Sequence, residues 1–284
     1  MFCPVVCRVK SSNRRRLMAR LTTWTNHAAN LLWALAPGSG TELGGGAVKL
    51  VAHRGAHGPG GEVENTLPAI QRCVALGVWG VELDIRLTAD GEAVIHHDAD
   101  AGRLWGRPDI VIEETTFASL RRELPEIPHL EEVLALAAGK VHLMLEIKES
   151  WRERPAVPAR VSRALANLEP GEDYHLLSLV PDHLEGFADI PRAAFVDVAW
   201  MNATEIIRAN LALGHGAVAG SFLLFGRRRL QQLRDAGRQV GTGFLENPRA
   251  LRREVWRGAD WLFTDRVVTL QSYLNGLEPC REAR

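Results

Sequence analysis

Short apolar runs alternate with helix-like stretches from residue 47 almost to the end of the 284-residue chain. This alternation predicts a parallel sheet, and a chain of this length favours closing it into an eight-stranded (β/α)8 TIM barrel over leaving it open. The runs that predict strands are Val48–His53, Val81–Leu87, Ala93–His97, Val141–Lys148, His175–Leu179, Ala193–Ala199, Ala217–Leu223, Val240–Phe244 and Trp261–Thr264. The stretches that predict helices are Thr66–Leu76, Thr116–Arg122, His129–Ala138, Arg160–Leu168, Ala203–Leu213, Arg227–Ala236 and Pro248–Arg257.

The predicted barrel is slightly irregular between its second and third strands. Asp90-Gly91 is a tight-turn signal, and the connection there is too short for a crossover helix. Nine strand candidates compete for eight places, and Ala193–Ala199 and Ala217–Leu223 have the weakest patterns. The segment from His97 to Ile127 is short, so we expect no inserted module there.

The first 46 residues differ from the rest. A basic segment (10–20) precedes an apolar run (30–36) and a glycine-rich tract ending at Gly46. This order resembles a signal peptide, but the run is short and lies late. We therefore expect an amphipathic leader helix with a linker (1–46), a barrel domain (47–275) and a C-terminal tail (276–284). A start at Met18 is an alternative. The expected location is cytoplasmic, with export by the leader as the other option.

Composition excludes several classes of function. Lys+Arg and Asp+Glu both total 34, so no global basic field exists to hold nucleic acid or an anionic membrane, although a local patch is compatible with this balance. No run approaches the ~18 apolar residues that span a bilayer. The four cysteines have no disulfide or zinc spacing, which fits a reducing compartment. We expect a small-molecule substrate, no nucleic-acid partner and no stable membrane insertion; the oligomeric state is left open.

Carboxylates occur inside two predicted strands. Alternation places Glu82 and Asp84 on the face that would line the barrel, with aliphatic residues between them on the outer face. Glu146 and Lys148 share a face in the same way, and they could form a structural ion pair. Beside Glu82 and Asp84, however, Glu146 is better explained as a third ligand of one cation, with Lys148 near a phosphate. Three carboxylates suit Mg²⁺ or Ca²⁺ rather than zinc.

Two histidine motifs stand at the ends of predicted strands. His53 is followed by Arg54, a residue type suited to bidentate phosphate contact, although such a pair is also found in ordinary surface loops. In His96-His97, neighbouring side chains face opposite ways, so only one is expected to face the site. Glu64 precedes a predicted helix and could merely complement its dipole. We expect His57, in a glycine-rich loop, to be exposed, and His129 to lie at a helix N-terminus.

These motifs together resemble the glycerophosphodiester phosphodiesterase family. The resemblance covers roughly residues 47 to 270 and implies a TIM barrel. It runs in order along the chain through His53-Arg54-Gly55, Glu64-Asn65-Thr66, Glu82-x-Asp84, Asp90-Gly91, His97-Asp98, Ile127-Pro128-x-Leu130-Glu131-Glu132, Glu146-Ile147-Lys148 and Gly258-Ala259-Asp260-x-x-x-Thr264-Asp265.

The resemblance also implies roles. His53 and His97 would be the acid/base pair, with His96 a packed bystander. Arg54 would lie in the catalytic centre, and Glu64 would be an extra metal contact or an orienter of Arg54. Asn65 would support the local loop. Near the last strands the run Val240–Phe244 lacks the aromatic that walls the site in the family, and Phe244 or Trp200 could replace it.

The implied activity is metal-dependent hydrolysis of glycerophosphodiesters to glycerol 3-phosphate and an alcohol. The implied route is attack by the glycerol 2-hydroxyl, with His53 as base and His97 as acid, followed by opening of a cyclic phosphate. Near alternatives are lysophospholipid cleavage, of the lysophospholipase D type, and a lyase that stops at the cyclic phosphate. A non-catalytic phosphodiester-binding protein is a distant alternative, because every core residue is present.

Overall fold

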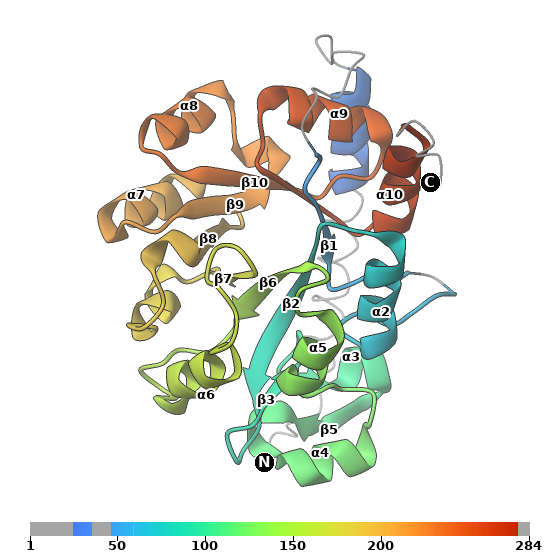
Figure 1. Ribbon diagram of the computed structural model, residues 1–284, viewed down its shortest axis with the longest axis vertical. Helices are drawn as coiled ribbons and strands as arrows, with labels where there is room; N and C mark the ends of the chain where they lie inside the picture. Colours follow the sequence, from blue (N-terminus) through green and yellow to red (C-terminus); the bar gives the residue numbers. More distant parts are fainter. Residues whose placement is uncertain (1–24, 36–46, 59, 278–284) are drawn as a thin grey trace, which may run out of the picture.

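Eight parallel strands form a closed barrel surrounded by helices, as the sequence predicts (Figure 1). The computed structural model describes residues 25–35, 47–58 and 60–277. The ring closes because β1 pairs with both β2 and β11. In ring order the strands are β1 (Leu50–His53), β2 (Gly80–Leu87), β6 (His142–Ile147), β7 (Tyr174–Ser178), β8 (Phe195–Ala199), β9 (Ala217–Ser221), β10 (Gln239–Gly243) and β11 (Trp261–Thr264).

The ninth predicted strand is the irregularity itself. β3 (Ala93–Ile95) pairs antiparallel with β2 as a hairpin and lies outside the ring. Gly91, with φ of 80°, supplies the left-handed turn between them. The two strands with the weakest patterns, β8 and β9, are both full members of the barrel, so the surplus candidate lies elsewhere than expected.

A small module does occupy the segment after β3, and the expectation that none fits there is wrong. It consists of β4 (Asp100–Ala101), α3 (Gly102–Trp105), β5 (Arg107–Val111), η1 (Ile112–Glu114) and α4 (Phe117–Glu123). A short segment suffices because β3, which pairs with the barrel strand β2, completes the apolar core of the module. Val94 of β3 packs into the module's own apolar cluster, with Ile112 and Leu120 at its centre.

Helices cover the outside of the barrel (Figure 1). They are α2 (Leu67–Leu76), α5 (Leu130–Ala137), α6 (Ala156–Ala164), α7 (Ala203–Leu213), α8 (Arg227–Asp235), α9 (Pro248–Arg257) and α10 (Val267–Leu277). Caps at both ends are clearest in α9, where Asn247 accepts from the amides of Arg249 and Ala250, and Gly258 ends the helix with φ of 75°. Thr66 occupies the N-cap position of α2, but its hydroxyl bonds the Val63 carbonyl instead of capping. Short 3₁₀ segments η2 (Pro181–Gly186), η3 (Arg192–Ala194) and η4 (Phe222–Leu224) complete the connections.

One predicted helix has different bounds, and one helix is absent from the prediction. α6 begins at Ala156, four residues earlier than expected, directly after Pro155. The helix α10, at the C-terminal end of the described chain, was not expected at all. The predicted basic segment and glycine-rich linker lie outside the described residues, whereas residues 25–35 form a helix. Of the predicted C-terminal tail (276–284), Gly276 and Leu277 are the last residues of α10, and the rest lies outside the described residues. Among the residues that the structure describes, no helix has the length and apolar character needed to cross a bilayer.

The barrel has an inner and an outer apolar layer, which confirms the predicted strand faces. Val81, Leu83 and Ile85 of β2 pack outward with the helices. Met144 of β6 lies in the inner cluster with Trp261 and other strand residues. Glu82, Asp84 and Glu146 alternate with these outward residues, and all three are buried. The inner layer closes the barrel below them, so polar side chains gather at one end of it.

Candidate active site

Polar side chains converge at the carboxyl ends of four consecutive strands of the ring. β11, β1, β2 and β6 are neighbours in that order. His53 ends β1, and Asp265 directly follows β11. Glu82 and Asp84 lie in β2, and Glu146 lies in β6, where Asp84 and Glu146 are paired in register. Because parallel strands end at the same edge, this end of the barrel is where a TIM barrel places its site.

Three carboxylates form a compact group. One oxygen each from Glu82, Asp84 and Glu146 lies within 4.8 Å of the others. The Lys148 ammonium stands 2.7 Å from Asp84 Oδ1 and 2.7 Å from Glu146 Oε1. The predicted ion pair between Glu146 and Lys148 is thus formed, and it belongs to the same cluster as the predicted ligands.

The electrostatics of this group favour a bound cation. Burial, reinforced by the charge of Asp84, raises the pKa of Glu82. Burial alone would raise the pKa of Asp84 as well, but Lys148 and Arg54 hold it below its usual value. Glu82 Oε1 is buried and has no hydrogen-bond partner among the described residues. A buried acceptor without a partner costs free energy, and a divalent cation with oxygen ligands would satisfy it.

Asn65 orients the carboxylate of Asp84 from the loop after β1. Its side chain is buried, and its Nδ2 donates to Asp84 Oδ2 at 2.7 Å. Its backbone amide donates to the Arg54 carbonyl at 2.9 Å. Arg54 and Asn65 both have left-handed backbones, with φ of 56° and 58°. Asn65 therefore does more than support the loop, since it contacts a member of the carboxylate group directly.

The Arg54 guanidinium is held between two carboxylates. Its NH1 donates to Glu64 Oε1 at 2.8 Å, and its Nε lies 3.3 Å from Asp84 Oδ2. The Arg54 backbone amide donates to Glu82 Oε2 at 3.2 Å. Gly55, next in the chain, passes so close to α2 that a Cβ there would lie 2.9 Å from the Cβ of Ala69. The turn that aims Arg54 at the site therefore requires glycine.

Glu64 is bound by two arginines. Arg103, from the small module, donates to both Glu64 oxygens at 3.0 and 2.6 Å. Although burial opposes it, hydrogen bonds and charge from Arg103 and Arg54 lower the pKa of Glu64 to about 2. Glu64 lies outside the group of three carboxylates described above. Its contacts match the second predicted role, that of an orienter of Arg54. Arg103 has no place in the sequence prediction, because no periodic pattern marks the module.

His53 is backed by a carboxylate that sequence reasoning left without a role. Its Nδ1 lies 2.6 Å from Asp265 Oδ1, and its Nε2 lies 3.7 Å from Glu82 Oε2. Burial alone would lower the pKa of His53, but Asp265 and Glu82 raise it. The signal for Asp265 was its position directly after the last strand. The prediction that His57 is exposed is wrong, since its side chain is only 20% exposed. The glycine-rich loop folds back over the barrel end and brings His57 Nε2 to 3.6 Å from Asp265 Oδ1.

His97 has the same kind of partner. Its Nδ1 lies 2.8 Å from Asp98 Oδ1, and Arg103 donates to the other Asp98 oxygen at 2.6 Å. The His97 side chain is 32% exposed, so it can reach a molecule at the barrel end. His96 points the other way, is buried, and bonds the Asp100 carbonyl at 3.2 Å, as a bystander would. His129 caps α5, as expected.

The aromatic wall comes from Phe244, in the loop after β10. Its ring meets the His53 ring edge to face at 4.8 Å. Trp200, the other candidate, is 55% exposed. Gly241 in β10 leaves room for Phe263 of β11, because a Cβ on Gly241 would lie 2.7 Å from the Phe263 ring. The arrangement brings two carboxylate-backed imidazoles, two cationic side chains and a carboxylate group that could hold a cation to one end of the barrel, which suits proton transfer to and from a phosphate ester.

Comparison with known proteins agrees with this geometry. Residues 53–269 match the model of the glycerophosphoryl diester phosphodiesterase family. The chain is 30% identical over 134 residues to a glycerophosphodiester phosphodiesterase of Bacillus altitudinis, covering 43% of this chain and 54% of that protein. It is 28% identical over 119 residues to a human lysophospholipase D, covering 42% and 37%. An Oleispira antarctica phosphodiesterase, solved with its product sn-glycerol-3-phosphate, superposes with a TM-score of 0.69 at 21% identity over 80% of this chain and 96% of that one.

Proposed function

The chain belongs to the glycerophosphoryl diester phosphodiesterase family, and on that premise we propose that it hydrolyses glycerophosphodiesters to glycerol 3-phosphate and a free alcohol. The observation that carries the proposal is the buried group of Glu82, Asp84 and Glu146, which lies beside Lys148 at the mouth of a TIM barrel. A site that concentrates three carboxylates and two cations is built for a metal ion and an anionic ester together.

Glu82, Asp84 and Glu146 would hold one Mg²⁺ or Ca²⁺. Their donor set consists of oxygens only, and Glu82 Oε1 needs a partner. A bound cation would supply Lewis-acid polarisation of the phosphate. In this assignment Glu64 is not a ligand; it keeps Arg54 in place through the 2.8 Å contact. Arg54 and Lys148 would neutralise the charge that grows on the phosphate oxygens in the transition state.

The two histidines would move the protons. Asp265 takes one side of the His53 ring, which leaves Nε2 to accept the proton of the glycerol 2-hydroxyl as that oxygen attacks phosphorus. His97, held by Asp98, would give its proton to the departing alcohol oxygen as the P–O bond breaks. In the second step, neutral His97 would take a proton from water as the water oxygen attacks the phosphorus of the cyclic phosphate. Protonated His53 would return a proton to the 2-oxygen as the bond from that oxygen to phosphorus breaks. The atoms and charges then balance, and both histidines are restored.

The test is release of glycerol 3-phosphate from glycerophosphocholine with Mg²⁺, with Ca²⁺ and with EDTA. Wild type should be active with at least one cation and inactive with EDTA. His53→Ala should abolish release, whereas His57→Ala, which removes an imidazole whose Nε2 lies 3.6 Å from Asp265 Oδ1, should lose much less. A full-rate His53→Ala enzyme, or wild-type release in EDTA, would contradict the proposal. Accumulation of a cyclic phosphate would instead identify the lyase alternative.

A second candidate substrate, a lysophospholipid, is favoured by a specific surface feature. Exposed large apolar side chains follow three neighbouring strands, β7, β8 and β9, which lie across the ring from β1 and β2. They form an apolar rim of Leu179, Val180, Trp200, Met201 and Leu223, exposed by 37, 46, 55, 83 and 57%. An acyl chain extending from a phosphate bound at the carboxylates would meet this rim, because it borders the same end of the barrel.

Variants of two equally exposed tryptophans can distinguish between the two candidate substrates. Trp200 and Trp256 are 55% and 57% exposed, but Trp256 lies near the C-terminal end of α9 and so at the far end of the barrel. Trp200→Ser should lower kcat/KM for lysophosphatidylcholine by about ten-fold and leave glycerophosphocholine unchanged. Trp256→Ser should change neither. Equal losses on both substrates for Trp200→Ser would count against a role of the rim in binding lipid.

A further inference from the structure

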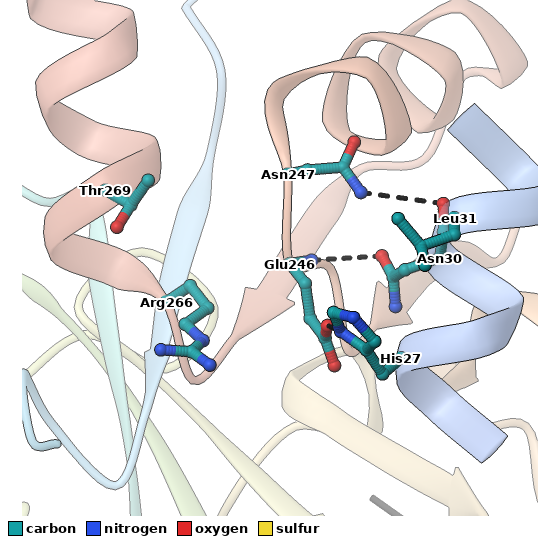
Figure 2. A pocket seen from close by; sticks show the side chains of 7 residues that line it. All are labelled: His27, Asn30, Leu31, Glu246, Asn247, Arg266 and Thr269. Atoms are coloured by element: carbon teal, nitrogen blue, oxygen red, sulfur yellow. Dashed lines mark hydrogen bonds and ion pairs between the residues drawn. The ribbon is translucent and has the colours of Figure 1, made fainter. Parts of the chain in front are cut away.

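The helix formed by residues 25–35, here called the leader helix, presents amides rather than leucines to the barrel. Figure 2 shows it directly beside the loop that joins β10 to α9. The helix and the loop together line one side of a pocket of about 220 Å³, and Arg266 and Thr269 line the other. Asn30 is only 1% exposed, whereas Leu31, Leu32 and Leu35 on the other side are 53, 71 and 73% exposed. Helices normally bury their apolar stripe. This helix instead buries a mixed face, on which Ala29 and Trp33 pack against the barrel core and Asn30 makes specific polar contacts.

Those contacts go to the backbone of one loop. Asn30 Nδ2 donates to the Phe244 carbonyl at 2.9 Å, and the Glu246 amide donates to Asn30 Oδ1 at 3.0 Å (Figure 2 shows the second bond). Asn26 Nδ2 donates to the same Phe244 carbonyl at 3.2 Å and to Glu246 Oε1 at 2.7 Å. One asparagine thus satisfies a donor and an acceptor two residues apart, which fixes the backbone on both sides of Leu245.

The other side of the loop is held by the barrel. The Leu245 amide donates to the Phe263 carbonyl at 3.1 Å, and the Thr264 hydroxyl donates to the Leu245 carbonyl. The loop therefore lies between β11 and the leader helix. Its first residue, Phe244, carries the ring that meets His53 at 4.8 Å. A path of direct contacts runs from Asn30 through Phe244 to the proposed general base.

The far end of the leader helix is anchored separately. Trp33 Nε1 donates to Glu254 Oε1 at 2.7 Å, and the Trp33 ring lies 5.4 Å from that of Phe222. The guanidinium carbons of Arg253 and Arg257 lie 4.3 and 5.1 Å from the Trp33 ring centre. Because these contacts secure the helix without the asparagines, loss of Asn30 should release the loop and leave the helix docked.

We propose that the leader helix is part of the active site, and that Asn30 is a positioning residue that holds Phe244 against His53. The proposal rests on the assignment of His53 as a proton-transfer group. Without the Asn30 bonds, the Phe244 carbonyl keeps only the longer bond from Asn26, at 3.2 Å, and the Glu246 amide loses its acceptor, so the loop is held less firmly on the side of the leader helix. The ring can then withdraw, and the imidazole is free to tilt away from the attacking oxygen. Misplacement of about 1 Å is enough to slow such a step substantially.

Kinetics of full-length variants test this claim. Asn30→Ala should lower kcat for glycerophosphocholine by about ten-fold while KM changes by less than about two-fold, since the phosphate ligands are untouched. Leu32→Ala, on the exposed side of the same helix, should match wild type. If Asn30→Ala folds poorly in a thermal melt, Asn26→Ala removes the other donor to Phe244 and should show a smaller loss of the same kind. A rise in KM with unchanged kcat would overturn the proposal.

A double-mutant cycle tests the path. In a Phe244→Ala background the ring is already absent, so Asn30→Ala should have no further effect on kcat. An equal loss in both backgrounds would show that Asn30 acts by another route and would refute its role through Phe244.

Hydrogen exchange gives a readout that does not depend on catalysis. In Asn30→Ala the amide of Glu246 loses its acceptor, so exchange across residues 244–247 should accelerate, whereas Leu32→Ala should leave it unchanged. Unchanged exchange in Asn30→Ala would overturn the positioning claim even in an active enzyme. A wild-type protein without activity would count against the proposed function alone, and the exchange measurement would then decide the structural contact.

Discussion

Substitution of Asn65 by glycine and by alanine separates a side-chain role from a backbone role. The buried amide of Asn65 donates to Asp84 Oδ2 at 2.7 Å, and the residue has a left-handed backbone with φ of 58°. Asn65→Gly removes the amide but accepts this backbone without strain. Asn65→Ala removes the same amide and places a Cβ in a conformation that alanine disfavours.

The two losses can be estimated from these contacts. A hydrogen bond to a buried carboxylate contributes about 1.5–3 kcal/mol, and both variants lose it. Alanine in the left-handed region costs a further ~1–2 kcal/mol. Glycine has its own cost of about 0.5–1 kcal/mol, because the unfolded chain gains conformational entropy at that position. This cost reduces the difference in stability between the two variants. The free energy of unfolding of Asn65→Ala should therefore be about 0–1.5 kcal/mol lower than that of Asn65→Gly, and both variants should be clearly less stable than wild type.

The loss of activity should depend only on the missing Asn65 amide, and not on the backbone preference of the new residue. Both variants leave Asp84 without its amide donor, and loss of a group that orients a metal ligand typically costs 10–100-fold, so similar losses in kcat/KM are expected for the two. Urea unfolding and glycerol 3-phosphate release at a saturating cation concentration measure both quantities. An Asn65→Gly enzyme as active as wild type would refute the orienting role. An alanine variant more stable than the glycine variant would refute the backbone argument.

Other predictions concern the cation, the pH dependence of stability and the small module. A concentration of Mg²⁺ or Ca²⁺ about 100 times its Kd should stabilise wild type by ~2.7 kcal/mol and raise its Tm, but not that of Glu82→Gln. Burial lowers the pKa of His142 to about 4 and that of His175 to about 3, so the folded protein excludes protons that the unfolded chain binds below about pH 6.5. Stability should thus fall as the pH drops, by about 2 kcal/mol per histidine between pH 7 and 5, and urea unfolding of His175→Gln should show a shallower fall. Arg103→Ala should lower kcat/KM by less than about ten-fold, because Arg54 still holds Glu64; an unchanged rate constant would exclude a supporting role.

The barrel was predictable because its strands carry a local signal. Apolar runs of strand length, separated by helical periodicity, identified all of its strands, and alternation within β2 and β6 placed Glu82, Asp84 and Glu146 on the inner face. A charged residue between aliphatic neighbours can be buried only where a partner exists, so the pattern itself indicates a site. Residues on regular strands are therefore the ones that sequence reasoning placed correctly.

Residues on loops and insertions were harder to predict for a physical reason. Arg103 reaches Glu64 from a module whose chain length gave no sign of a fold, because its core is completed by β3. Asp265 is marked only by its place after the last strand. His57 was expected in solvent because glycines surround it, yet the loop returns to Asp265. In each case the decisive contact joins distant parts of the chain, so no periodic pattern in the local sequence indicates it.

The leader helix shows a case in which hydrophobicity alone does not identify the buried face. Leu31, Leu32 and Leu35 are exposed, whereas Asn30 is buried on a face where Ala29 and Trp33 pack against the barrel core. The loop at Phe244 to Glu246 presents an open carbonyl and an open amide, and burying these against leucine would leave both unsatisfied. An asparagine satisfies both, so the polar groups of this loop, together with the packing of Ala29 and Trp33, decide which face of the helix is buried.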